Sequence, residues 1–581
     1  MEAFKSEVRN GMRIDWDVPI EMDDGVVLRC DVYRPVAEGK YPAIMTYGPY
    51  AKWLHLMDGY PAQWKVLTEK YPESLAGSSG KYANWEVADP EKWVPDGYAC
   101  VRVDSRGAGR SPGFMEVFSP REMKDFYDCI EWAAGQPWCS GKVGLNGISY
   151  YAMNQWCVAS LQPPHLAAMC VWEGAADWYR DLSHHGGIYC IFADTWYKDT
   201  VVRRQHGRGE RDFRSRINGE WSSGPETLSD EELNANRCDY GQDLLDHPLI
   251  DEYWKARMPD FSKINVPLLS AGNWGGVGLH PRGNIEGFMH AASEQKWLEM
   301  HGLDHFTHFY TDYGLALQKR FFGHFLKGED TCWTTQPKIA LHVRHPGEKF
   351  VERAESEWPL ARTRWTKFYL HPENATLSTE PHGKERAAEY EAVGKGLTFL
   401  TAPFEKETEI TGPAAAKLFI SSETEDADLF LVLRVFDPEM REITFQGSND
   451  PHTPVGHGWL RASHRKLDPR KSLPYRPYHT HDEKQPLKAG EVYELDVEIW
   501  PTSIVVPKGH RVGLSVRGRD YVYPGFENPP KQASERVYYG VGPFRHIHPQ
   551  DRPLRVFGRK VTLHTGPGRP AHLLLPIIPA K

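Results

Sequence analysis

The spacing of apolar and polar positions changes along the chain and divides it into regions. Residues 18–35 alternate apolar and polar around Asp23-Asp24-Gly25, which predicts an antiparallel hairpin. Short, continuously apolar runs follow, as is typical of parallel strands that are buried on both faces. These runs span residues 42–47, 98–104, 143–145, 166–172, 266–271 and 297–300.

One helix between these strands is clearly marked. Ser119-Pro120 followed by Glu122 forms a capping-box pattern with proline in the first turn, and an apolar face continues through Phe126 and Ile130 until Gly135. Strands that alternate with helices predict a doubly wound α/β sheet over roughly the first 330 residues.

The remaining chain has two other patterns. Residues 178–262 lose the strand signals and gain helix starts, which predicts a helical cap inserted between core segments 1–177 and 263–335. From residue 336 to 581 the alternation has a period of two, most clearly at 492–499, and predicts a β-sandwich. The segment 444–490 is too long for a turn, and we expect it to cross a domain face.

Composition narrows the class of protein. A chain of 581 residues is longer than one hydrophobic core usually accommodates, so at least two domains are expected. The net charge of -9 is small and its signs are interspersed, which argues against nucleic acid or a membrane surface as partner. No apolar run approaches the roughly 18 residues of a membrane span, and the amino terminus lacks a signal-peptide core, so a cytoplasmic location is expected.

Neither the cysteines nor the glycine-rich loop suggests a cofactor. Nine scattered cysteines without a CxxC pair are typical of reduced thiols that pack as small apolar groups. The loop 107–113 follows a strand but is not GxGxxG, and Pro112 interrupts the helix start that a nucleotide site needs. We expect no cofactor and no metal.

Ser149 is the candidate nucleophile. It lies directly after a predicted strand and before a helical run, where a nucleophile elbow holds its serine at strained backbone angles. Gly147 supplies the small neighbour two residues before, whereas Tyr151 replaces the second glycine of GxSxG. A bare GxS is common by chance, so its context decides.

That context carries a family resemblance. The segments VRVDSRGAGRSPG (101–113), Gln136-Pro137-Trp138, Gly141-Lys142-Val143-Gly144 and Gly147-Ile148-Ser149-Tyr150-Tyr151-Ala152 resemble the cocaine-esterase-like and X-prolyl dipeptidyl-peptidase group of α/β-hydrolases. The nucleophile of that group follows GxSYxG or GxSYxA. The resemblance implies an α/β-hydrolase core, a helical cap and a carboxy-terminal jelly roll. It also implies an oxyanion hole made by the Tyr150 amide and the Tyr50 hydroxyl, although Tyr50 can also be read as a packing aromatic.

The base should follow the last core strand. His301, His305 and His308 all lie in that window, and Gly302-Leu303-Asp304-His305 resembles the loop that presents the histidine in this superfamily, so His305 is preferred over His308. The three histidines also have helical zinc-ligand spacing, but HExxH is absent and the preceding strand and Gly302 favour a loop.

The acid is the member of the triad that does not follow the family pattern. The family pattern places an aspartate after the penultimate core strand, where this chain has Gly275. Glu173, just beyond the strand at 166–172, is our hypothesis for a replacement, because catalytic groups gather at that edge of such sheets. Glu173 or Asp177 can equally serve only to start the cap, and Glu286 is a further candidate.

These residues predict a serine hydrolase that cleaves a small-molecule ester or amide through an acyl-enzyme. Trp172, Trp178 and Trp274 flank the catalytic segments and are candidates to line the substrate pocket, or to pack in the core. An aminopeptidase or amidase, an acyltransferase, and a non-catalytic scaffold are the alternatives. For the last domain we consider carbohydrate binding, closure of the cleft and a homodimer interface.

Overall fold

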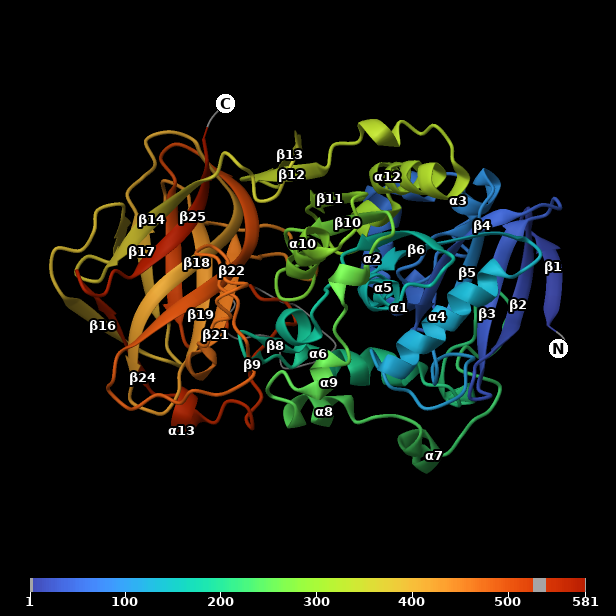
Figure 1. Cartoon of the computed structure of the whole chain (residues 1–581), viewed down its shortest axis with the longest axis horizontal. Helices are drawn as coiled ribbons and strands as arrows, with labels where there is room; N and C mark the ends of the chain where they lie inside the picture. Colours follow the sequence, from blue (N-terminus) through green and yellow to red (C-terminus); the bar gives the residue numbers. More distant parts are fainter. Residues whose placement is uncertain (1–3, 526–539, 580–581) are drawn as a thin grey trace.

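Two large sheets organise the chain in the computed structural model, which describes residues 4–525 and 540–579 (Figure 1). The first has eleven strands in the order β1-β2-β3-β5-β4-β6-β7-β10-β11-β12-β13. Their bounds are β1 Lys5–Arg9, β2 Met12–Glu21, β3 Val27–Pro35, β4 Tyr41–Gly48, β5 Ala99–Asp104, β6 Cys139–Ile148, β7 Leu166–Trp172, β10 Leu268–Asn273, β11 Lys296–His301, β12 Ile339–His345 and β13 Lys349–Glu355.

The strands from β5 to β12 in this order run parallel, and the outer strands at both ends are antiparallel. The six apolar runs and the hairpin of the sequence correspond to strands of this sheet, so these predictions are confirmed. The sheet also continues past residue 336, where the composition predicted the second domain to begin. Strand β12 joins β11 because its apolar side chains continue the core layer, with Ile339 and Leu341 fully buried.

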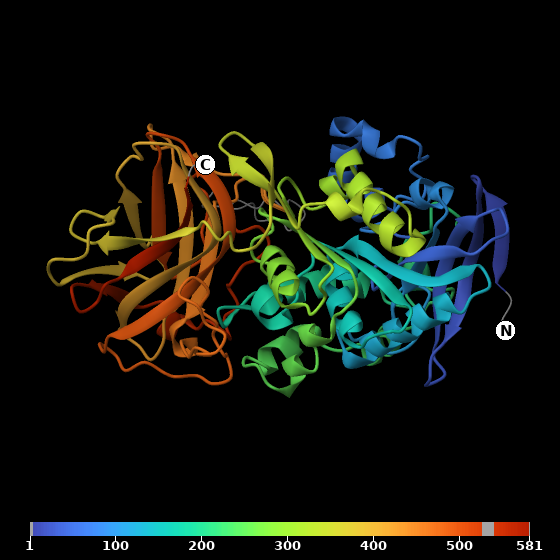
Figure 2. The ribbon, with the colours of Figure 1, turned by 45° about the horizontal axis from the view of Figure 1, so that its top comes forward.

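Helices cover both faces of this sheet, as the alternating pattern predicts (Figure 2). The main ones are α2 Pro61–Lys70, α4 Pro120–Ala134, α5 Tyr150–Ser160, α10 Pro281–His290 and α12 Asp312–Phe322. Helix α4 begins at the expected cap, since the Ser119 hydroxyl accepts from the Glu122 amide. In a full capping box the Glu122 carboxylate would accept from the Ser119 amide. Here it accepts instead from the Phe118 amide and the Tyr150 hydroxyl.

The segment between β7 and β10 is built from short helices and one small hairpin. Its helices include α6 Phe192–Trp196, α7 Asp230–Ala235, α8 Tyr240–Asp246 and α9 Glu252–Lys255, and the hairpin pairs β8 His184–His185 with β9 Ile188–Tyr189. In Figure 1 most of this green segment lies below the core, with α6, α8 and α9 beside the second sheet. It forms one side of the pocket described below.

The second sheet has twelve strands and closes on itself, because β25 pairs with both β14 and β18. Its strands are β14 Arg364–His371, β15 Thr376–Ser378, β16 Arg386–Glu391, β17 Leu397–Thr401, β18 Thr408–Ser422, β19 Asp428–Phe436, β20 Glu442–Ile443, β21 Gly456–Arg461, β22 Tyr493–Val506, β23 Arg511–Arg517, β24 Lys560–Thr565 and β25 His572–Ile578. Aliphatic side chains fill its interior. The result is a barrel-like β-domain, and its jelly-roll topology remains a prediction.

The segment 444–490 contains a strand, β21, that the sequence pattern did not reveal. Before this strand, residues 446–450 leave the β-domain and contact the core sheet. The Ser448 amide donates to the Gly275 carbonyl at 3.0 Å, and the His305 amide donates to the Ser448 carbonyl at 3.2 Å. The expected crossing of a domain face is therefore present at its amino-terminal end.

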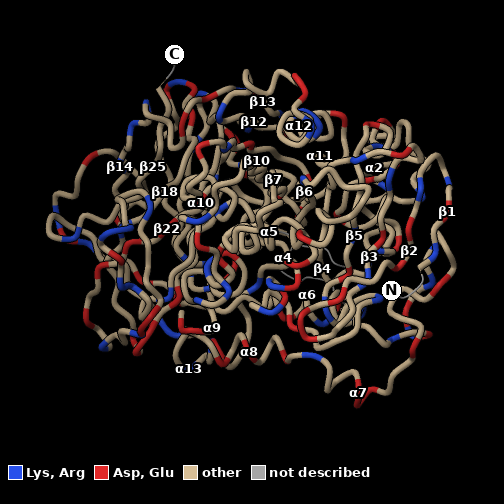
Figure 3. Tube along the Cα trace, turned by 45° about the vertical axis from the view of Figure 1, so that its right-hand side comes forward, with Lys and Arg blue, Asp and Glu red and all other residues tan. Residues whose placement is uncertain are grey.

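Charged residues are spread over both parts of the molecule, with acidic and basic positions interspersed in the view of Figure 3. Within residues 4–525 and 540–579, no helix combines the length and the apolar character that crossing a bilayer requires.

Candidate active site

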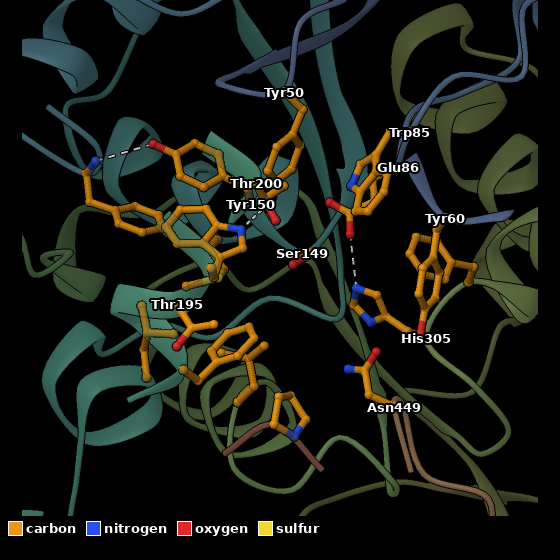
Figure 4. Close-up of a pocket in the computed structure, with 18 residues that line it drawn as sticks. Tyr50, Tyr60, Trp85, Glu86, Ser149, Tyr150, Thr195, Thr200, His305 and Asn449 are labelled. Carbon is orange, nitrogen blue, oxygen red and sulfur yellow. Dashed lines mark hydrogen bonds and ion pairs between the residues drawn. The ribbon is translucent and has the colours of Figure 1, made fainter. Parts of the chain in front are cut away.

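Ser149 occupies the sharp turn between β6 and α5. Its backbone has φ 59° and ψ -115°, a strained conformation for a residue with a side chain, and it caps the start of α5. Gly147, two residues before, is needed here because a Cβ at that position would lie 2.5 Å from Cβ of Tyr151. The turn thus presents the Ser149 side chain at the carboxyl edge of the sheet, half-buried in a pocket (Figure 4).

His305 and Glu173 form a buried pair beside this turn. Glu173 follows the last residue of β7 and has φ 50°, and its Oε2 lies 2.6 Å from Nδ1 of His305. Glu173 is fully buried and His305 is 7% exposed. A carboxylate at Nδ1 fixes the tautomer of a histidine and stabilises its protonated form, which is the part the acid plays in a serine-hydrolase triad.

Further polar groups hold the Glu173 carboxylate in place. The Asn273 amide donates to Oε1 at 3.2 Å, and Nε2 of His301 lies 3.3 Å from the same atom. The Ser448 hydroxyl, from the β-domain, donates to Oε2 at 3.3 Å. Glu173 therefore receives support from the core sheet and from the second domain.

The charges of this cluster shift the pKa of each member. Burial disfavours the charged form of His305, but Glu173 and then Glu86 outweigh it and raise its pKa to about 10. Burial likewise disfavours the Glu173 carboxylate, yet the charge of His305 and the hydrogen bonds from His301 and His305 hold its pKa below the usual range. For His301, Glu299 and Glu173 overcome burial and raise the pKa to about 9.

The alternative candidates lie elsewhere. The Asp177 carboxylate accepts from the amides that begin the cap and pairs with Arg180, while Glu286 pairs with Arg476. His308 packs against His301 and His342, and burial lowers its pKa to about 2. Of the three acids proposed from the sequence, Glu173 is the one whose carboxylate contacts His305, whereas Asp177 and Glu286 pair with arginines.

Tyr50 and Tyr150 both reach the pocket, as Figure 4 shows. The Tyr50 hydroxyl accepts a hydrogen bond from the Trp196 indole at 3.0 Å, which leaves its own proton available as a donor. The backbone amide of Tyr150 is the first in α5, where the N–H groups have no partner inside the helix. The Tyr150 hydroxyl points away from this position and donates to Glu122, whose pKa burial raises to about 7.

The pocket is a cavity of about 130 Å³ that is lined in large part by aromatic side chains. Trp172, Trp178 and Trp274 are not among its lining residues. They are fully buried in the core because they pack against Phe309, Phe118 and Trp358 respectively. The aromatic walls come instead from other residues, among them the two oxyanion candidates: Tyr50, Tyr60, Trp85, Phe118, Tyr150, Phe192, Trp196 and Phe306.

Glu86 is a charged residue of this site that the sequence did not suggest. It lies on the connection between β4 and β5, and its Oε1 is 3.1 Å from Nε2 of His305. Its carbonyl accepts from the Ile148 amide at 3.0 Å, which ties it to the nucleophile strand. Nothing in the spacing of Asn84-Trp85-Glu86-Val87 indicates this contact, because it is made by loops 219 residues apart.

Gly275 stands where the family pattern has an aspartate, and the β-domain fills the space beside it. A Cβ at Gly275 would lie 2.5 Å from Cα of Gly447. A side chain at this position therefore requires residues 446–450 to move, and with them Ser448.

Two groups of residues in the described ranges place potential metal ligands within 4.8 Å of one another. One group consists of Glu173, His280 and His305, and two of its members, Glu173 and His305, already bind each other. The other consists of His185, Cys190 and His546, in which Nδ1 of His185 lies 2.9 Å from Nε2 of His546. The helical zinc face of His301, His305 and His308 is not among these groups.

Comparison with solved structures identifies the family. The chain is 32% identical to a CocE/NonD family hydrolase from Staphylococcus aureus, covers 98% of its own length and 94% of that chain, and superposes with a TM-score of 0.83. The chain belongs to this family. The resemblance to cocaine-esterase-like hydrolases predicted from the sequence is therefore confirmed.

Other comparisons agree with membership of the CocE/NonD family. The X-Pro dipeptidyl-peptidase (S15 family) model matches residues 24–307, and the model of the X-Pro dipeptidyl-peptidase C-terminal non-catalytic domain matches residues 331–573. Cocaine esterase of Rhodococcus sp. (strain MB1 Bresler) is 26% identical over 97% of this chain and 98% of its own. An α-amino acid ester hydrolase shares the fold at 16% identity, with a TM-score of 0.68 and coverage of 98% and 97%.

Proposed function

We propose that this protein is a serine hydrolase that cleaves a small-molecule carboxylic ester through an acyl-enzyme on Ser149. The observation that carries the proposal is the 2.6 Å contact between His305 Nδ1 and Glu173, made beside a serine held in a nucleophile elbow on the same cavity. The names of relatives support the class, since they include a cocaine esterase and putative serine esterases of Mycobacterium.

In the acylation step, neutral His305 takes the proton of the Ser149 hydroxyl as the oxygen attacks the ester carbonyl. The carbonyl oxygen becomes negative and accepts from the Tyr150 amide and the Tyr50 hydroxyl. Glu173 stabilises the protonated imidazole. His305 then gives the proton to the departing alcohol, and the acyl group remains on Ser149.

In the second step, His305 removes a proton from water, which attacks the acyl-serine carbonyl. The carboxylic acid leaves and Ser149 recovers its proton from His305. Apart from the substrate and this water molecule, both steps use groups of the chain alone.

The cavity favours a compact, apolar acyl or aryl group. Its volume of about 130 Å³ and its aromatic walls match a small ring or short chain better than a polymer. An amide leaving group is the alternative, because X-Pro dipeptidyl-peptidases are among the curated relatives.

A fluorophosphonate probe tests the proposal directly. We expect one phosphonyl adduct per chain by intact-mass measurement, and we expect the Ser149→Ala variant to take up none. Ser160→Ala, at the end of the same helix α5, is the matched control and should label as the parent does. Folded protein that does not label, or label retained in Ser149→Ala, contradicts the proposal.

A substrate panel then separates ester from amide hydrolysis. Matched 4-nitrophenyl esters and 4-nitroanilides of the same acyl groups report the leaving-group preference through kcat/KM. We expect the esters to be hydrolysed faster, and a preference for anilides would assign an amidase.

A further inference from the structure

Three donor side chains meet where the cap contacts the β-domain. His185 ends β8, Cys190 directly follows β9, and His546 belongs to the carboxy-terminal part of the β-domain. Each offers one ligand atom, these atoms lie within 4.8 Å of one another, and all three residues are fully buried. Figure 1 shows β8 and β9 at the junction with the second sheet. The sequence predicted no metal here, since His546 is 361 residues from His185.

The two imidazole rings turn their lone pairs toward each other. Nε2 of His185 lies 3.1 Å from the Asp181 carbonyl oxygen, which can only accept, so this nitrogen carries the proton. Nδ1 of His546 donates to Oδ1 of Asp520 at 2.8 Å, and the other oxygen of Asp520 accepts from the His546 amide. The remaining nitrogens, His185 Nδ1 and His546 Nε2, are 2.9 Å apart. In two neutral rings both atoms carry a lone pair, so only a proton or a cation between them makes the contact favourable.

The outer partners of both rings are those of metal-binding histidines. Such a histidine donates its other ring N–H to a carboxylate or a backbone carbonyl, which fixes the tautomer and directs the lone pair to the metal. His546 has the Asp520 carboxylate in this place, and His185 has the Asp181 carbonyl. A shared proton would satisfy the two nitrogens alone, whereas a metal ion also uses the nearby sulfur of Cys190.

From this arrangement we propose that His185, Cys190 and His546 bind a zinc ion that links the cap to the β-domain. Imidazole nitrogen and thiolate sulfur are ligands that zinc prefers, at about 2.0–2.1 Å and about 2.3 Å. Binding widens the distance between the two nitrogens from 2.9 Å to about 3.3 Å, the edge of a tetrahedron with these bond lengths. The Cys190 thiol gives up its proton to solvent, and a water molecule takes the fourth position.

The zinc ion holds one wall of the cavity beside Ser149 from behind. Helix α6 starts two residues after Cys190 and carries Trp196, which lines the cavity and donates to the Tyr50 hydroxyl at 3.0 Å. Pro543, three residues before His546, lines the same cavity. The ion therefore positions both segments relative to each other and takes no part in ester cleavage.

Metal content tests the site directly. The protein is produced without a polyhistidine tag in zinc-supplemented medium and is then desalted in the presence of EDTA. We expect it to retain about one zinc ion per chain by inductively coupled plasma mass spectrometry, and Cys190→Ala to retain less than about a tenth of that amount. Cys129→Ala, at another fully buried cysteine, on α4, is the matched control and should hold as much zinc as the unmodified protein.

Cobalt and thermal unfolding supply two further readouts. Co²⁺ added to metal-free protein should give a thiolate-to-cobalt charge-transfer band in the near ultraviolet that saturates at about one equivalent, because one thiolate coordinates the ion. Zinc in about 100-fold excess over its Kd should raise Tm by about 2 °C or more, since the assembled site exists only in the folded chain. Cys190→Ala should show neither the band nor the rise in Tm.

Two results overturn the inference. Protein that retains no zinc and shows neither the cobalt band nor the rise in Tm has a shared proton between the two rings. Zinc that remains in Cys190→Ala lies at another site, such as the group of Glu173, His280 and His305. Should Cys190→Ala fold poorly, the cobalt band of unmodified protein whose exposed Cys332 has been alkylated decides instead, and its absence overturns the inference. Labelling of Ser149 by fluorophosphonate tests the proposed function separately.

Discussion

Glu173 and His305 are 132 residues apart in the sequence, and their side chains meet at 2.6 Å between Oε2 and Nδ1. This carboxylate lies at the end of β7, the strand next to the one that ends at Ser149, whereas glycine occupies the position after β10 at which the family pattern has an aspartate. Because β7 lies between β6 and β10, a carboxylate at its end still faces the loop after β11 that carries His305.

Replacing this acid should abolish most of the activity. In Glu173→Gln, His305 loses the carboxylate that fixes its tautomer and stabilises its charge, so we expect kcat to fall by roughly 10³-fold or more, as for other triad orienters. Steady-state kinetics with a 4-nitrophenyl ester measures it. Asp177→Asn, four residues further on, is the matched control, and a loss confined to Asp177→Asn would place the acid in the cap.

The Tyr50 hydroxyl should act mainly on the chemical step. Tyr50→Phe removes a donor aimed at the developing oxyanion, and a loss of roughly 100-fold in kcat with little change in KM is expected. Tyr60→Phe removes a hydroxyl from the same cavity and serves as the control. If both variants behave alike, the Tyr50 hydroxyl is not an oxyanion donor.

Activity on neutral esters should rise well into the alkaline range. The base works only when deprotonated, and Glu173 and Glu86 raise the pKa of His305 to about 10 against the effect of burial, so most of the base is protonated at pH 7. The kcat/KM profile should therefore increase with pH above 7. A plateau already reached near pH 7 with a neutral ester would contradict this electrostatic picture.

Ser448 offers a test of the second domain. Its hydroxyl donates to Glu173 Oε2 at 3.3 Å, and losing one such bond to a carboxylate corresponds to a decrease in kcat of about tenfold or more. We expect Ser448→Ala to show this decrease with KM unchanged. We also expect a shift in the acid limb of its pH profile of kcat/KM. Ser378→Ala, elsewhere in the β-domain, should have neither effect. An unchanged pH profile would mean that Ser448 only packs.

Gly275 should tolerate no side chain without cost. The methyl group of Gly275→Ala would lie 2.5 Å from Cα of Gly447, so the 446–450 segment must shift away from Glu173. We expect a lower Tm and a lower kcat together, measured by thermal unfolding and ester turnover. Gly383→Ala has no atom within 4 Å of the new methyl and is the control. Normal kcat in Gly275→Ala would show that the segment need not stay in place.

The sequence predicted the parts of this protein that depend on local patterns. Continuous apolar runs correspond to the parallel strands, Ser119 caps α4, and Ser149 occupies a strained turn after β6. Glu173 was predicted from its position just after a strand, because the carboxyl ends of parallel strands meet at one edge of the sheet. These inferences need only periodicity, caps and sheet geometry.

What the sequence did not predict depends on contacts between distant loops. Glu86 and Ser448 reach the His305–Glu173 pair from two separate connections, and their neighbours in the chain carry no recurring spacing. The three tryptophans were candidates because they flank catalytic segments, but position along the chain does not say which face of the fold a large ring enters. The sequence also did not predict that the first sheet extends to β12 and β13. Apolar alternation indicates a strand, but it does not reveal which sheet the strand joins.

The contact of residues 446–450 with Glu173 and His305 has a consequence for the order in which the protein matures. A ribosome releases Ser149, Glu173 and His305 well before it has synthesised Ser448, so the growing chain carries its nucleophile before the acid is fully supported. We expect chains arrested at residue 440 to react poorly with fluorophosphonate, and chains released at full length to react fully. Hydrolytic competence would then be a property gained late in synthesis.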